Sequence, residues 1–180
     1  LNTGFVSHCK KIDKSDAEWF TVAALASAAG LTLSDREKKF DCRKIWAELR
    51  NSHELDLTRG TISNISLLGY FRSLRRLYLS DNKISNLNVL FELKSLQELY
   101  LSHNVIQEIS PMRSLQSLIV LDLADNLIRS LDPLQYLDNL VVLNVQDNPV
   151  EIWGGLLSHE NLLIESDLIE LVEEDEMNAD

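Results

Sequence analysis

One interval constrains this chain more than any other feature of its sequence. Four asparagines, Asn82, Asn104, Asn126 and Asn148, stand 22 residues apart, each in the frame L-x-x-L-x-L-x-x-N-x-I, with Val replacing two aliphatic residues in the last copy. A fixed period of this length is typical of repeat proteins, in which every copy forms one coil and stacked coils share a core. The chain is therefore expected to form a solenoid.

The frame predicts a short strand and a turn in each coil. Both leucines of L-x-L point to the same side because strand side chains alternate, so that side becomes the core. We expect an α/β solenoid with a short curved parallel sheet and an irregular or 3-10 convex side. Its five repeats are expected at 52–73, 74–95, 96–117, 118–139 and 140–161. The first repeat has Gly60 in place of the asparagine, and Leu162 continues the leucine column after the last.

The asparagines are expected to be structural. A turn inside the coil leaves backbone N–H and C=O groups away from water, and such groups must be paired. A carboxamide both donates and accepts, so a ladder of stacked asparagines can satisfy the turn of its own coil and of the next.

Residues 1–51 precede the repeats and predict a helical cap, which a repeat stack needs to cover its open apolar end. A capping box at Ser15–Glu18 predicts a helix that ends at Gly30 and is buried on most sides. A second capping box lies at Ser34–Glu37, and a further helix is expected over Asp41–Arg50.

The only two cysteines, Cys9 and Cys42, both lie in this cap. A disulfide between them is favoured because so small a helical unit has little core of its own. Two buried free thiols are the alternative. A zinc site would have to borrow His8 or His53, since no C-x-x-C occurs.

The repeat pattern resembles the 22-residue leucine-rich repeat class of bacterial internalins and of the eukaryotic phosphatase-regulating repeat protein. The resemblance covers about residues 52–161. The cap is similar to that of extracytoplasmic bacterial repeat proteins, through Cys9, the run Thr21–Leu25, the run Ala28–Gly30, and Cys42. This chain departs from that cap by an extra segment, Leu31–Asp41.

The resemblance implies a non-catalytic module that binds a protein or cell-surface ligand, works outside the cytoplasm and carries a disulfide between Cys9 and Cys42. The alternative is an intracellular regulatory or scaffold protein with reduced cysteines. Because the sequence opens on Leu1 and not on Met, we expect either a mature form or a recombinant piece.

The distribution of charged residues limits the classes of partner that the chain can bind. The net charge is −11, but residues 151–180 contain no Lys or Arg, so most of the excess lies in the expected C-terminal capping segment and acidic tail, 162–180. Here a short helix is expected at Asp167–Val172, followed by a disordered tail. Without a basic face, nucleic-acid binding is not expected. The longest uncharged stretch, Trp19–Ser34, is too short to cross a bilayer.

Binding is expected on the concave face, where side chains alternating with the inward leucines point outward. The candidate partner-binding residues are Arg76, Tyr78, Glu98, Tyr100, His103, Val120, Asp122, Val142 and Asn144. Tyr78 and Tyr100 are expected to be neighbours on adjacent strands, either as an interface anchor or as a cross-strand ladder. The histidines have no metal-ligand spacing, Cys42 has no base placed beside it, and no Gly-rich phosphate loop occurs. We therefore expect no enzyme, no metal and no cofactor. We also expect a monomer.

Overall fold

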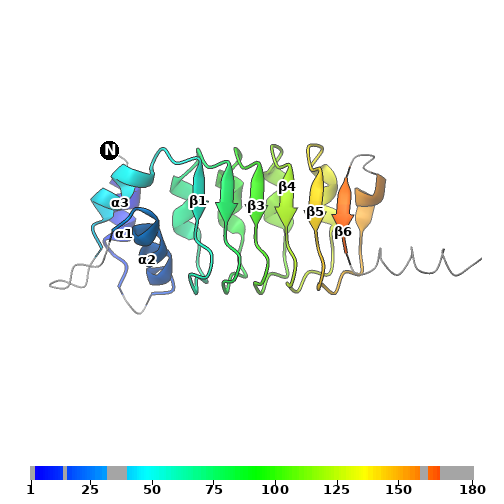
Figure 1. The fold of residues 1–180 in the computed structure, drawn as a ribbon, viewed down its shortest axis with the longest axis horizontal. Coiled ribbons are helices and arrows are strands. Elements are labelled where there is room, and N and C mark those ends of the chain that lie inside the picture. Colours follow the sequence, from blue (N-terminus) through cyan, green and yellow to red (C-terminus); the bar gives the residue numbers. More distant parts are fainter. Residues whose placement is uncertain (1–2, 14–15, 32–39, 159–161, 167–180) are drawn as a thin grey trace, which may run out of the picture.

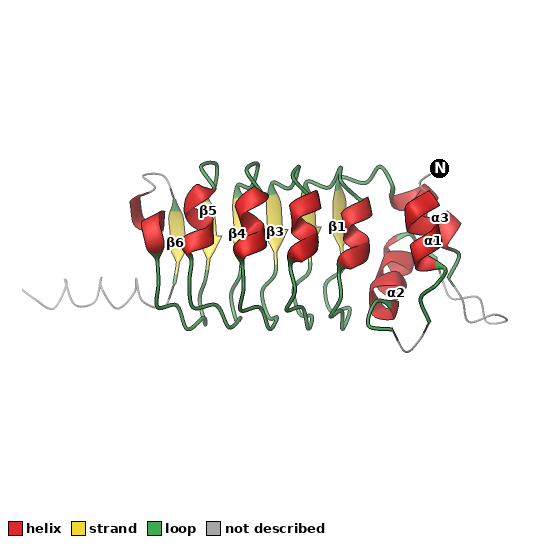
Figure 2. Cartoon of the chain, turned by 180° about the vertical axis from the view of Figure 1, so that it is seen from behind, coloured by secondary structure: helices red, strands yellow, loops and turns green. Residues whose placement is uncertain are grey.

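The computed structural model describes residues 3–13, 16–31, 40–158 and 162–166. A helical cap is followed by a stack of coils, with strands on one side and short helices on the other (Figures 1 and 2). The predicted capping box at Ser34–Glu37, the predicted helix at Asp167–Val172 and the acidic tail lie outside the described residues, as does Ser15.

The strands form one parallel sheet in chain order. They are β1 (Glu54–Asp56), β2 (Arg76–Tyr78), β3 (Glu98–Tyr100), β4 (Val120–Asp122), β5 (Val142–Asn144) and β6 (Leu163–Glu165). From β1 to β5 each residue pairs with the residue 22 positions later. The repeat frame predicts these five strands, and the parallel sheet is confirmed.

The sixth strand departs from the frame. Val142 pairs with Leu163, 21 residues later, so Leu162 does not lie opposite Leu140 as the leucine column predicts. Ile164 now faces Leu143 and the interior, although it is only half-buried. The sheet thus gains a strand that the leucine spacing does not predict.

The opposite side of each coil is a 3-10 helix (Figure 2). These are η1 (Ser66–Tyr70), η2 (Asn88–Glu92), η3 (Ser110–Ser114), η4 (Asp132–Tyr136) and η5 (Gly154–Ser158). The leucine columns of strands and helices meet in one continuous core that also includes the cap. The predicted solenoid with a 3-10 side is confirmed.

The asparagines form the expected ladder, but its direction is opposite to the prediction. Asn104 donates to the backbone O of Leu101 in its own coil and of Leu79 in the preceding coil, both at 3.0 Å. It accepts the N–H of Ile84, also in the preceding coil, at 2.9 Å. Each asparagine therefore connects its coil to the one before, and Gly60 has no preceding strand to which an amide could donate.

The residue before each ladder position has a left-handed backbone. Arg59, Asp81, His103, Asp125 and Asp147 have φ between 49° and 58°. Non-glycine residues adopt this region rarely, and Asp and His more readily than most. This sharp turn redirects the chain from the strand, and the asparagine that follows binds the carbonyl groups that the turn leaves inside.

The cap consists of α1 (Thr3–Cys9), α2 (Trp19–Ala28) and α3 (Cys42–Leu49). Helix α3 matches its prediction, with the Asp41 carboxylate accepting two backbone N–H groups at its start. Helix α2 ends before Gly30, as expected, and Gly30 has φ of 68°.

Helix α2 begins later than the capping box at Ser15–Glu18 predicts. The helix begins at Trp19 without a side-chain cap, because the carboxylate of Glu18 has other partners. It accepts His8 Nε2 at 3.0 Å and the hydroxyl of Ser66 in η1. The helix is also not buried on most sides, since Phe20 is 42% exposed; only one face, around Leu25, packs inward.

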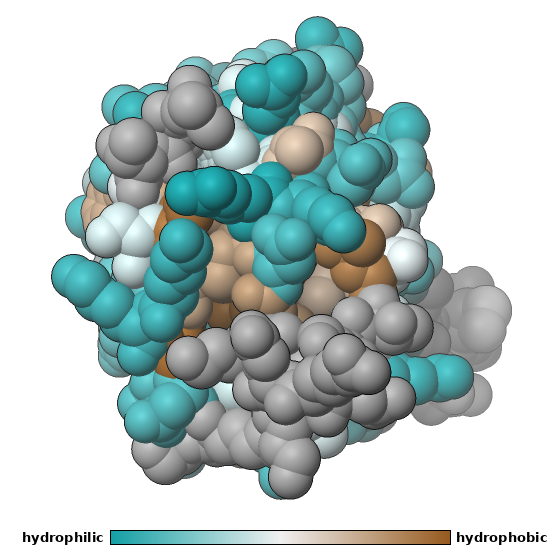
Figure 3. Space-filling view, turned by 90° about the vertical axis from the view of Figure 1, so that its left-hand side faces the viewer, coloured by the Kyte–Doolittle hydropathy of each residue, from teal (hydrophilic) through white to brown (hydrophobic). Residues whose placement is uncertain are grey.

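Aromatic side chains join the cap to the first coil. Phe5 of α1 is fully buried and contacts the rings of Trp46, Tyr70 and Phe71, with ring centroids 5.4–5.8 Å apart. The buried hydroxyl of Thr21 donates to the backbone O of Asn64. At the outer end of the cap, apolar surface is framed by hydrophilic side chains (Figure 3).

Candidate functional site

The outward residues of the strands and turns form four rows, together called the sheet face. The rows are Glu54, Arg76, Glu98, Val120, Val142 and Leu163; then Asp56, Tyr78, Tyr100, Asp122, Asn144 and Glu165; then Thr58, Ser80, Ser102, Ala124 and Gln146; then Arg59, Asp81, His103, Asp125 and Asp147. All nine candidate binding residues lie on this face. No helix or loop of the described chain crosses it (Figure 1).

Tyr78 and Tyr100 lie in the middle of the sheet face. Their rings are stacked, with centroids 4.8 Å apart and planes within 5°. The hydroxyl of Tyr100 donates to Glu98 at 3.2 Å. Burial raises the pKa of Tyr100 above its usual value, and the hydrogen bond to Glu98 raises it further. Both effects favour the neutral phenol. The two stacked rings form a rigid aromatic surface, and the hydroxyl groups are its polar part.

An aspartate lies on each side of the tyrosine pair. Asp56 pairs with Tyr78 across β1 and β2, and Asp122 pairs with Tyr100 across β3 and β4. Each carboxylate accepts the backbone N–H two residues later, at 2.9 Å and 3.1 Å. The hydroxyl and N–H of Thr58 lower the pKa of Asp56, which keeps this carboxylate charged.

The first row of the sheet face is apolar in its C-terminal half. Val120 and Val142, both predicted, are in register with Leu163, which is 67% exposed. Ile119 and Val141, one residue before their strands, are about 40% exposed. These five residues are called the apolar strip. Leu163 was not predicted because the register changes at β6. An Ile and a Val directly before the strands could have indicated Ile119 and Val141.

Ion pairs link adjacent coils along the sheet face. Arg76 contacts Glu54 at 2.6 Å, and Arg59 contacts Asp81 at 3.2 Å. His103 Nδ1 donates to Asp125 at 2.5 Å, and this contact raises the pKa of His103. The interactions are solvent-exposed and individually weak, but they use both arginines of the face.

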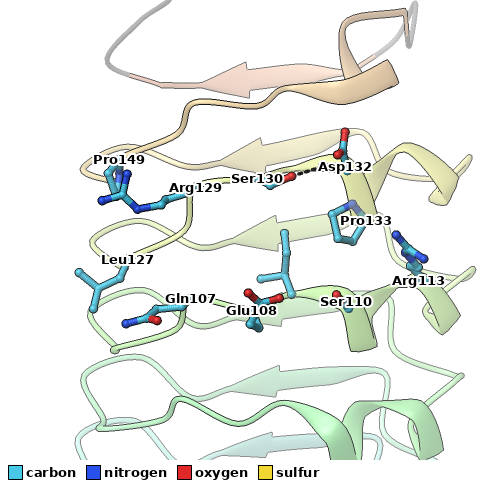
Figure 4. Close-up of a pocket in the computed structure, with 11 residues that line it drawn as sticks. Gln107, Glu108, Ser110, Arg113, Leu127, Arg129, Ser130, Asp132, Pro133 and Pro149 are labelled. Atoms are coloured by element: carbon cyan, nitrogen blue, oxygen red, sulfur yellow. Dashed lines mark hydrogen bonds between the residues drawn. The ribbon is translucent and has the colours of Figure 1, made fainter.

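A second exposed apolar feature follows the turns. Val105 and Leu127, each 45% exposed, lie in the same position of successive coils. Leu127 also lines a shallow groove of about 450 Å³ between the return segments of three coils (Figure 4). Three charged groups around this groove, Glu108, Arg113 and Arg129, are exposed, and a fourth, Asp132, is half-buried.

Metal and membrane features are absent from the described part of the chain. Residues 3–13, 16–31, 40–158 and 162–166 contain no cluster of three His, Cys, Asp or Glu side chains suited to a metal ion. None of the helices that the structure describes is both long and apolar enough to span a bilayer. In the cap, Cys9 and Cys42 lie at disulfide distance, with Cα atoms 6.0 Å apart.

Comparison with known families agrees with the repeat geometry. The family model described as leucine-rich repeats (two copies) matches residues 72–114 and, overlapping them, 94–136. Residues 72–136 are leucine-rich repeats. Leucine-rich repeats form a protein-interaction fold, whose stacked coils present an extended surface. Among curated proteins, none matches the chain in sequence.

Solved structures share the fold. Internalin C2 of Listeria monocytogenes is 31% identical over 68% of this chain and 54% of its own, with a TM-score of 0.65. An internalin F structure from the same organism is 18% identical over 90% of this chain and 52% of its own, with a TM-score of 0.63. This second likeness shows the fold alone. The chain spans about half the length of these two structures.

A plant protein is also similar. The leucine-rich repeat ectodomain of the receptor kinase SOBIR1 from Arabidopsis thaliana is 26% identical over 62% of this chain and 67% of its own, with a TM-score of 0.52. The leucine-rich repeat fold of this chain therefore has relatives in proteins of different kingdoms.

Proposed function

We propose that this chain is a non-catalytic module that binds a protein or cell-surface ligand through its sheet face. The observation that carries the proposal is the tyrosine stack at 4.8 Å, placed beside the apolar strip on an uncovered surface. Large rigid aromatic side chains dominate many binding interfaces. Solvation alone gives no reason for the exposed Leu163, Ile119 and Val141.

The size of the face limits how it can bind. Six strands about 4.8 Å apart span ~24 Å, and three outward residues per strand cover ~10 Å. This area of a few hundred Å² is smaller than the ~800 Å² per partner of a standard interface. A stable partner therefore has to contact the turn edge as well, where Val105 and Leu127 are exposed.

The test is a double substitution of the stacked pair, Tyr78→Ala with Tyr100→Ala, used in a pulldown from host or envelope material. We expect the variant to lose a protein that the unchanged chain captures, while its melting temperature stays within a few degrees. The matched control is Phe91→Ala with Tyr136→Ala, which removes two rings, each 50% exposed, from η2 and η4 on the opposite side. Capture by the tyrosine variant at the unchanged level would move the site elsewhere.

The proposal places the module outside the cytoplasm. Two observations support this: the similarity to internalin C2 and the separation of Cys9 from Cys42, which suits a disulfide. The alternative is an intracellular regulator or scaffold with reduced thiols. Intact mass of protein from its native source, measured with and without reductant, separates the two, because a mass that reductant does not change supports the intracellular alternative.

A further inference from the structure

The two outer faces of the tyrosine stack have different surroundings. The row Asp56, Tyr78, Tyr100, Asp122 runs across four strands in register. The rings cover each other's inner faces, so their outer faces turn toward β1 and β4. Aspartate is much shorter than tyrosine, and the strands are about 4.8 Å apart. Each outer ring face therefore rises beside a carboxylate.

The two sides differ in what lies beyond the aspartate. Next to Asp56 is the ion pair between Glu54 and Arg76, where a cation already occupies the surface. On the side of Asp122 lie Val120 and Val142 of the apolar strip. A cationic side chain on the Asp122 side would thus find an aromatic face, a carboxylate and an adjoining apolar surface.

The charged side chains of the sheet face are mostly acidic. Its rows carry eight carboxylates against two guanidinium groups: Glu54, Asp56, Asp81, Glu98, Asp122, Asp125, Asp147 and Glu165 against Arg59 and Arg76. Both arginines are already in ion pairs with Asp81 and Glu54. Charge complementarity directs specificity and association rate, and it favours a basic partner here.

We propose that the sheet face binds a basic protein segment, with one Lys or Arg side chain seated on the outer face of Tyr100 and against Asp122. An apolar residue beside that Lys or Arg contacts Val120 and Val142. A cation over an aromatic face is attracted by the ring, and more strongly when water is displaced. The inference rests on the proposed function and narrows its partner to a basic, apolar segment.

The probe is a phage-displayed library of random linear peptides, selected on the purified chain. We expect enriched peptides to carry Lys or Arg next to an apolar residue, relative to the unselected library. The binding of one synthesised winner is expected to weaken as salt is raised, because the contacts are partly electrostatic.

Two aspartate variants form a matched pair for that peptide. Asp122→Asn and Asp56→Asn remove the same charge from opposite sides of the stack. Both keep the local turn, because Asn144 accepts the N–H of Gln146 in the same geometry at 3.1 Å. We expect Asp122→Asn to raise the Kd about threefold to tenfold and to reduce its salt dependence. Asp56→Asn should leave the Kd within about twofold, since its side adjoins no apolar strip.

The outcomes separate this inference from the proposed function. Two results would contradict a Lys or Arg bound between Tyr100 and Asp122. One is the enrichment of peptides without basic residues, and the other is an equal change in Kd for Asp56→Asn and Asp122→Asn. In that case, loss of peptide binding in the Tyr78→Ala, Tyr100→Ala variant would leave the proposed function standing. Unchanged peptide binding by this tyrosine variant would overturn both.

Discussion

The carboxamide of Asn126 accepts the backbone N–H of Ile106, which belongs to the preceding coil, at 3.0 Å. The same side chain donates to three carbonyl groups, one of them Leu101 in that preceding coil. With 3% of its surface exposed, this amide satisfies backbone groups that water cannot reach.

We expect Asn126→Ala to lower the free energy of unfolding by about 1–3 kcal/mol, because several buried groups lose their partner. Urea unfolding followed by circular dichroism measures the loss. Asn148→Ala provides the comparison: it makes equivalent bonds but is only half-buried, so water can replace them and the loss should be smaller. A larger loss for Asn148→Ala would contradict this account.

Thr21→Val should lower the free energy of unfolding by about 1–2 kcal/mol, since the fully buried hydroxyl gives up its bond to Asn64 without a change in shape. Ser27→Ala, an exposed position on the same helix, is the control and should be neutral. If the two variants were equally stable in urea, the joint between cap and first coil would not depend on this bond.

Cys9→Ser should lower the free energy of unfolding by about 3–4 kcal/mol under oxidising conditions, because a cross-link to Cys42 closes a long loop in the unfolded chain. The unchanged chain should show the same loss when reductant is added. The variant itself should be insensitive to reductant. Stability of the unchanged chain that does not respond to reductant would argue for free thiols.

The pKa of His103 should lie above its ordinary value of 6.5, and Asp125→Asn should bring it down. NMR titration of the ring measures both. A raised pKa means that the folded state holds the proton more tightly, so the contact stabilises fully below the ordinary pKa and is lost as pH rises through the folded pKa. Both groups are 58% exposed, which limits the gain to less than about 1 kcal/mol.

Much of the fold follows from the sequence because one interval fixes it. Five strands, their register and the inward leucines come from the 22-residue frame, and the end of α2 comes from Gly30. The sixth strand does not follow from this frame, because backbone pairing in a sheet does not require a leucine at a fixed position. Val142 pairs with Leu163, 21 residues later, and not with the residue 22 positions later. Helix α1 is too short to be indicated by periodicity, and its position depends on the contacts of Phe5 with distant aromatic rings.

The candidate site could be predicted only in part. Alternation along the strands places Tyr78 and Tyr100 outward, but the stacking of their rings depends on side-chain packing that spacing does not specify. The left-handed turns were also not foreseen, because Asp81 and Asp125 occupy them instead of glycine. The predicted start of α2 is wrong because the Glu18 carboxylate bonds His8 of α1 and Ser66 of η1. Both residues are distant from Glu18 in the sequence.

The backward direction of the ladder has a consequence for how such a stack can grow. A duplicated 22-residue unit brings with it the amide that fastens it to the unit before, and offers the next unit the carbonyl and N–H groups that it needs. Interior duplication therefore requires no matching change in its neighbours. Loss of the first coil is different, because the buried amide of Asn82 would lose two hydrogen-bond partners. These are the backbone N–H of Ile62 and the backbone O of Leu57. Length in this architecture is easier to vary in the middle than at the start.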